Sequence, residues 1–145
     1  MDLTQLAFLL TSAKRDVFSD YLDNVANQGL LPYKAIFQSG NKRGESLWTH
    51  ILNMVCVVEA LQPILDLNDT ERRVLFTAIT VHDINKMRTE PKSFSRLAIE
   101  PVIRELIDDI GFDMFFPEWQ KYLADIEALI RDHSGHYAVG GDSLI

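Results

Sequence analysis

Apolar residues recur every three or four positions through most of the chain, which is the spacing of amphipathic helices. Five segments follow this pattern, at residues 3–25, 46–61, 68–86, 97–110 and 117–133. No useful length of sequence alternates strictly between apolar and polar residues, as a half-buried strand would. The pattern predicts an all-α fold, a single compact helical domain of about five to six helices.

Local signals set the expected ends of the first three helices. The first helix should end near Gly29, and Pro63 should limit the second. Asn68, with Glu71 three residues later, has the spacing of a capping box at the start of the third helix. This third helix is expected to stop near Lys86, where the sequence becomes polar and basic.

Two polar segments between helices carry positive charge. Lys42 and Arg43 lie in the first of them, a glycine-containing loop with at most one short apolar turn. Lys86, Arg88 and Lys92 lie in the second, just after the third helix. These side chains either form a basic rim for a phosphate-bearing substrate or are ordinary solvated charges.

Composition limits the class of protein. The chain has 145 residues and a formal net charge of −7, which argues against a surface that wraps nucleic acid throughout and allows a local basic patch. The single cysteine, Cys56, lies in an apolar run, so we expect it to be buried, in a reducing compartment. With no signal segment and no run of about 20 apolar residues, a cytoplasmic protein without a membrane span is expected. Residues 1–145 should form one domain, either complete or the N-terminal part of a longer protein.

Three of the four histidines, namely His50, His82 and His133, occupy core-facing positions of three different predicted helices. Taken singly, each is more often a hydrogen-bonded core residue than a metal ligand. Together they would place three imidazoles in one small core, each with two ring nitrogens to satisfy, and a shared cation would satisfy several at once. The joint pattern therefore indicates a metal site.

Asp83 follows His82 directly, and neighbouring residues at a helix end can both turn towards one ion. A neutral nitrogen with an anionic oxygen suits a divalent cation, and the residues do not distinguish Mn, Co, Ni, Mg, Fe and Zn. An isolated His-Asp pair is common by chance. Its alternative is a surface pair at a helix terminus.

Three segments together resemble successive motifs of the HD phosphohydrolase superfamily. They are Leu47-Trp48-Thr49-His50, Val81-His82-Asp83-Ile84-Asn85-Lys86 and Ile130-Arg131-Asp132-His133-Ser134-Gly135-His136. The order His-Asp-x-x-Lys before a later histidine-rich segment is most similar to the HD nucleases of CRISPR systems, namely the helicase-nuclease and the HD domain of the type I-D effector large subunit. The resemblance implies an HD-type helical fold, one or two divalent ions, and metal-dependent cleavage of phosphodiester bonds in DNA, usually single-stranded.

The resemblance also implies which residues bind metal. His50, His82 and Asp83 match the first ligands, and His133 matches a ligand for a second ion. His136 is either a further ligand, if the last helix extends that far, or a solvent-exposed loop residue.

Asp83 and Lys86 are the expected catalytic residues. Asp83 would bridge the ion and the attacking water, and Lys86 would place its ammonium near the charge that develops on the phosphoryl group. The alternative for Lys86 is an ordinary lysine at a helix C-terminus, where the helix dipole favours it. Lys86, Arg88 and Lys92 are the expected substrate-binding residues.

Two departures from the family pattern bear on the second ion. Nucleolytic members usually carry a further histidine between the lysine and the last histidine pair, and residues 87–132 contain none. The closing aspartate should come from a later helix, but only Asp142 follows His136, in a glycine-rich tail. Asp142 is either that ligand or a solvated loop residue, and in the second case the chain is a truncated domain.

Two other functions stay open at this point. An HD phosphohydrolase acting on nucleotides or small phosphomonoesters would use the same ligands in a closed pocket. A non-catalytic docking module would keep the histidines as structural residues. In a larger effector the partners would be single-stranded DNA and other subunits of the complex, and Phe18 and Tyr21 would form either a docking face or part of the core.

Overall fold

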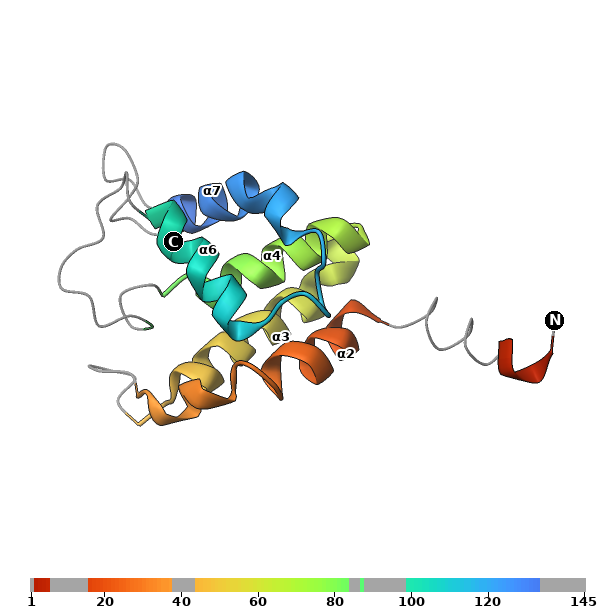
Figure 1. Ribbon diagram of the computed structural model, residues 1–145, viewed down its shortest axis with the longest axis horizontal. Helices are drawn as coiled ribbons and strands as arrows, with labels where there is room; N and C mark the ends of the chain where they lie inside the picture. Colours follow the sequence, from red (N-terminus) through yellow and green to blue (C-terminus); the bar gives the residue numbers. More distant parts are fainter. Residues whose placement is uncertain (1, 6–15, 38–43, 84–86, 88–98, 134–145) are drawn as a thin grey trace.

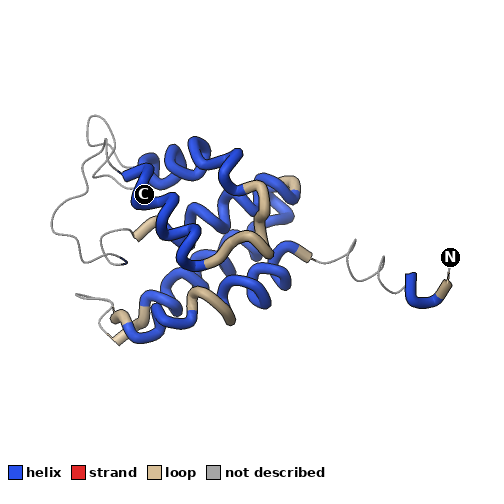
Figure 2. The backbone as a smooth tube through the Cα atoms, viewed as in Figure 1, coloured by secondary structure: helices blue, strands red, loops and turns tan. Residues whose placement is uncertain are grey.

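Helices form nearly all of the regular structure, with α4 packed among the others (Figures 1 and 2). The computed structural model describes residues 2–5, 16–37, 44–83, 87 and 99–133. Of these residues 76% are helical and none forms a strand, so the all-α prediction is confirmed. The elements are α2 (Val17–Tyr21), the π-helix η1 (Leu22–Ala26), the 3₁₀-helix η2 (Leu31–Ala35), α3 (Leu47–Leu65), α4 (Asp69–Val81), α6 (Ile99–Ile110), the 3₁₀-helix η4 (Trp119–Tyr122) and α7 (Leu123–His133).

The first helix was predicted to run without a break from residue 3, and this is wrong at Asp16. Asp16 has an extended backbone, with φ −66° and ψ 140°, and its carboxylate accepts a hydrogen bond from the Ser19 N–H at 3.2 Å. It is therefore an N-cap at which α2 begins. On the helix that follows, Tyr21 is fully buried and Phe18 packs against the core, so core packing is the role of this face.

α3 continues through Pro63, which was predicted to limit it. Proline removes one backbone N–H, and near the end of a helix this breaks a single hydrogen bond without preventing the last turn. α3 ends instead at Asp66, which adopts the left-handed conformation with φ 50° and ψ 45°. The Asp66 N–H still reaches the Gln62 carbonyl oxygen at 2.8 Å.

One side of α3 is apolar and exposed. The side turned to the core carries Leu47, Ile51 and Val55. Cys56, one helical step from Val55, is exposed, so the prediction that it is buried is wrong. By length and composition alone α3 meets the criteria for a membrane span, with 19 residues, a mean hydropathy of 1.2 and 17% of its span buried. Core helices of soluble proteins meet the same criteria, so this is weak support for a span.

α4 begins with the predicted capping box. The Asn68 side chain accepts from the Glu71 N–H at 2.8 Å, and the Glu71 side chain accepts from the Asn68 N–H at 2.9 Å. Eight of the 13 residues of α4 are buried, and the helix packs against α2, α3, α6 and α7. The position of α4 is therefore fixed from several sides.

The C-terminal end of α4 comes earlier than predicted. The helix was expected to stop near Lys86, but its last residue is Val81. The His82 N–H turns to the Ile79 carbonyl at 3.4 Å, a contact three residues back that tightens the final turn. His82 and Asp83 consequently lie at the end of the helix, outside its regular hydrogen-bond ladder.

The last three elements follow their sequence signals closely. Pro101 lies in the first turn of α6, where its missing N–H has no partner to lose, and Gly111 ends α6 with φ 88°. Pro117 precedes η4, so the last predicted helix opens as a 3₁₀ turn before α7. Its buried residues are Trp119, Leu123, Ile126 and Ile130.

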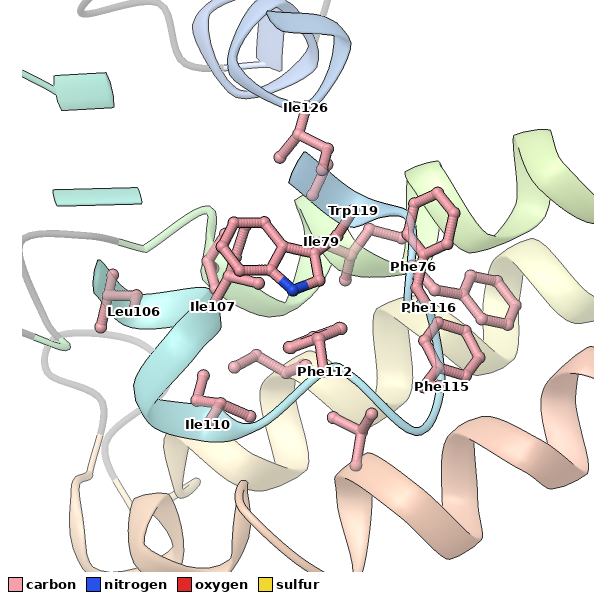
Figure 3. Packing of buried hydrophobic residues seen from close by; sticks show 14 of the residues in the cluster. Phe76, Ile79, Leu106, Ile107, Ile110, Phe112, Phe115, Phe116, Trp119 and Ile126 are labelled. Atoms are coloured by element: carbon pink, nitrogen blue, oxygen red, sulfur yellow. The ribbon is translucent and has the colours of Figure 1, made fainter. Parts of the chain in front are cut away.

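Several aromatic side chains lie together in the core, among more numerous aliphatic ones (Figure 3). The ring of Tyr21 meets Phe76 and Phe115 edge to face, at centroid distances of 5.6 Å and 5.4 Å. The Thr80 hydroxyl donates to the Phe76 carbonyl at 2.6 Å. Because that hydroxyl has one proton, the Tyr21 hydroxyl must be the donor in the 2.7 Å bond between Tyr21 Oη and Thr80 Oγ1. This bond joins α2 to α4 inside the core.

Gly29 makes the closest backbone approach among the described glycines. A Cβ atom at this position would lie 1.7 Å from the Ile110 carbonyl oxygen, at the end of α6. We expect Gly29→Ala to lower the free energy of unfolding by about 3 kcal/mol or more, because backbone must move to relieve the overlap. Gly44→Ala is the control for urea unfolding, since nothing lies within 4 Å and only its positive φ of 97° costs stability, about 1 kcal/mol. Equal losses in the two variants would contradict the close approach.

Burial raises the pKa of Tyr21 well above its ordinary value of 10.0, and the hydrogen bond with Thr80 offsets this only in part. Because the pKa of Tyr21 is higher in the folded chain than in the unfolded chain, the free energy of unfolding keeps its full value below pH 10. It falls as the pH rises above 10. At pH 8, Tyr21→Phe should be less stable than the wild type by about 1 kcal/mol, for the lost hydrogen bond. Above pH 10 the wild type should lose about 1.4 kcal/mol per pH unit that the variant keeps. Urea unfolding at both pH values tests this, and an unchanged difference at pH 11 would contradict it.

Candidate metal centre

The centre lies where the C-terminal end of α4 meets the first turn of α3, on the left-hand side of Figure 1. Ser46 caps α3 through a hydrogen bond from the Thr49 N–H to its hydroxyl at 3.1 Å. Leu47 is fully buried, and the Trp48 indole donates to the Ala26 carbonyl at 2.8 Å. These contacts fix the first turn of α3, in which His50 is the fourth residue.

His50, His82 and Asp83 come together there, as predicted. The Asp83 Oδ2 atom lies 3.4 Å from His82 Nε2 and 3.6 Å from His50 Nε2. One ligand atom from each of the three residues lies within 4.8 Å of the others. The three side chains are 18%, 8% and 22% exposed in chain order, so the group is mostly shielded yet reachable from solvent.

The orientation of His82 is fixed by the backbone of α4. Its Nδ1 atom lies 2.6 Å from the Ile79 carbonyl oxygen. A carbonyl oxygen only accepts, so Nδ1 carries the proton, and in the neutral ring the Nε2 atom presents its lone pair. That Nε2 atom is the one that faces Asp83. A hydrogen bond from Nδ1–H to a backbone carbonyl is the usual support of a metal-binding histidine.

Glu45 is the residue that sequence reasoning missed. Its Oε1 atom lies 3.6 Å from His50 Nδ1, on the side of the ring opposite to Asp83, and its side chain is 26% exposed. A carboxylate in this position orients the imidazole and increases its basicity. The signal in the sequence is faint, since Glu45 only precedes the N-cap Ser46 in a loop.

The donor set fits a divalent cation. Bonds of about 2.1 Å place neighbouring ligand atoms about 3.0–3.4 Å apart, close to the two distances from Asp83. Direct N–H···O hydrogen bonds would be shorter, about 2.9 Å. Two imidazole nitrogens and one carboxylate suit Mn, Fe, Co, Ni or Zn, and three protein ligands leave coordination positions open, as in catalytic sites.

The other predicted site residues lie wholly or partly outside the described residues. His133 is the last residue of α7, and its side chain is outside them. His136, Lys86, Arg88 and Lys92 are all outside them, as are Lys42, Arg43 and Asp142. The described centre thus comprises the predicted His50, His82 and Asp83 together with Glu45.

Comparisons with known proteins yield no match to a family model, a curated protein or a solved structure. The centre is therefore characterised by its own chemistry. It contains two imidazoles and a carboxylate close enough together to hold a metal ion, with a backbone carbonyl beside one imidazole and a second carboxylate beside the other.

Proposed function

We propose that this protein is a divalent-metal-dependent phosphohydrolase that cleaves phosphodiester bonds in DNA. The observation that carries the proposal is the convergence of His50, His82 and Asp83 from two helix ends, with His82 Nε2 turned to the Asp83 carboxylate. The resemblance of the surrounding segments to HD nucleases adds the substrate, a single DNA strand.

The proposed roles of the residues follow from their positions. His50, His82 and Asp83 would hold the cation, which when bound supplies Lewis-acid activation of water and of the phosphoryl group. The Ile79 carbonyl keeps the proton of His82 on Nδ1, so that Nε2 stays a ligand. Glu45, whose Oε1 atom lies 3.6 Å from His50 Nδ1, is proposed to orient the ring of His50.

Asp83 is proposed as the residue that handles the proton. Its Oδ2 atom is turned to both imidazoles, and the carboxylate is proposed to accept a proton from the attacking water. Lys86 is proposed to stabilise the charge that develops on the phosphoryl oxygens. In this scheme the Asp83 carboxylate holds the cation and also accepts the proton, and an amide or an alkyl side chain cannot perform both tasks.

The proposal predicts metal-dependent cutting of a labelled single-stranded DNA by the purified chain, tested with Mg, Mn, Co, Ni and Zn. Asp83→Ala and His82→Ala should lower the rate by at least about 100-fold, since each removes a ligand and not merely its support. Asp108→Ala removes an exposed carboxylate on α6 and should leave the rate unchanged. Circular dichroism checks that every variant is folded.

Three results would contradict this function. Full activity in a folded Asp83→Ala or His82→Ala variant would remove the site from the reaction. Faster turnover of nucleoside monophosphates than of the oligonucleotide would instead indicate a small-molecule phosphohydrolase. No cutting with any ion, together with no bound metal after purification without chelator, would indicate a docking module.

Glu45 provides a separate prediction that concerns metal affinity. Glu45→Gln should weaken Co²⁺ or Mn²⁺ binding by about 10- to 100-fold, the usual effect of removing a carboxylate that supports a ligand histidine. Calorimetric titration measures the affinity, and the visible absorption of Co²⁺ reports whether the coordination is retained. Asp108→Gln is the control, and equal affinities of Glu45→Gln and wild type would show that Glu45 does not support His50.

A further inference from the structure

Hollows lie on two sides of the candidate metal centre, and the two sides differ in the charge of their lining. On one side, adjoining hollows of about 270 Å³ and 430 Å³ follow the seam between α4 and α7 from His82 to Leu67. Their lining is apolar except for the imidazole of His82, two hydroxyls and three carboxylates, on Glu71, Asp125 and Asp132, and no lysine or arginine among the described residues lines them. A phosphate-bearing strand would be repelled along this seam.

On the other side, an open hollow of about 590 Å³ adjoins the loop before α3. Its lining combines a cation, two aromatic rings and two hydroxyls with the carboxylate of Glu45, and comprises Lys34, Phe37, Gly44, Glu45, Ser46, Trp48 and Thr49. Glu45 is also the residue beside His50, so the hollow and the centre share this residue. Whatever binds here lies next to the proposed ligands.

Phe37 is the most exposed ring of this hollow. Its side chain is 62% exposed, although a large apolar side chain gains free energy by burial. The backbone beneath it is held in place by the bridge between Phe37 and Ser46 and by the hydrogen bond from the Leu47 N–H to the Ile36 carbonyl at 2.7 Å. An exposed ring on a fixed backbone offers a flat face for stacking.

Lys34 supplies the positive charge. Its Nζ atom lies 4.3 Å from the centroid of the Trp48 ring, which is itself held by the hydrogen bond from its indole to the Ala26 carbonyl. The cation–π contact keeps the ammonium at the hollow while its N–H groups stay available to an anion. Aromatic faces beside a lysine are the combination with which proteins bind single-stranded nucleic acid.

We propose that this hollow binds a single strand of DNA, with Phe37 stacking on a base and Lys34 contacting a phosphate, and leads the strand past Glu45 to the metal centre. This assignment rests on the proposed function, because it names the route of the same substrate. A DNA duplex should not bind in this way, since its bases are stacked on one another and cannot present a face to Phe37.

Binding is measured apart from cleavage, by fluorescence anisotropy of a labelled oligothymidine with the full chain in EDTA. Phe37→Ala should weaken binding at least about five-fold, the low end of what loss of one stacked base costs. Ile64→Ala, which truncates another highly exposed apolar side chain, 79% exposed, should bind as the wild type does. Lys34→Gln should lower the slope of log affinity against log salt by about 0.7, one phosphate contact to a single strand.

The outcomes separate this inference from the proposed function. Unchanged binding by Phe37→Ala, equal binding of a duplex of the same length, or no binding by the wild type would each overturn the assignment, even if metal-dependent cutting is found. Weakened binding by Phe37→Ala together with a reduced salt slope for Lys34→Gln would support it, even if no ion produces cutting.

Discussion

The candidate centre depends on where α4 ends. Because α4 is buried over most of its length and packs against four other helices, its C-terminal residue can shift little. The contact between α4 and α3 positions this residue beside the first turn of α3. The bond between Tyr21 and Thr80 and the capping box at Asn68 act on the same helix from its side and its start. The tight final turn at Ile79 then directs both His82 and Asp83 out of the helix.

Electrostatics explain why the arrangement of His50, His82 and Asp83 suits a cation. The Ile79 carbonyl accepts a hydrogen bond from His82 Nδ1, so in the neutral ring the lone pair of Nε2 would face an oxygen of Asp83, and two acceptors that face each other repel. A positive charge between them would change this repulsion into attraction, and a divalent ion would do the same for His50. The separations of 3.4 Å and 3.6 Å are longer than direct hydrogen bonds and match atoms that share a third partner.

Sequence periodicity was sufficient for the fold class, and it singled out His50 and His82, which stand at positions where an aliphatic side chain would fit the pattern and which the fold brings close to Asp83. It failed where a local hydrogen bond outweighs the pattern. Asp16 interrupts the first helix by capping it, and α4 ends at Val81 although the sequence remains compatible with a helix. Pro63 shows the opposite error, since a proline near a helix end removes too little to stop it.

Glu45 and Phe37 were beyond sequence reasoning for another reason. Neither belongs to a periodic stripe or a motif, and each matters only through what the fold puts next to it, which is His50 in one case and an open hollow in the other. Glu45 and Phe37 line the same hollow, so the two sides of the centre differ in what they present to a substrate. With carboxylates along the α4–α7 seam, and with a lysine, the exposed ring of Phe37 and the partly buried ring of Trp48 on the side of α3, the approach of an anionic chain would be favoured from one side. A net charge of −7 strengthens this bias, because a polyanion repelled by most of the surface binds only where local cations and stacking faces outweigh the repulsion.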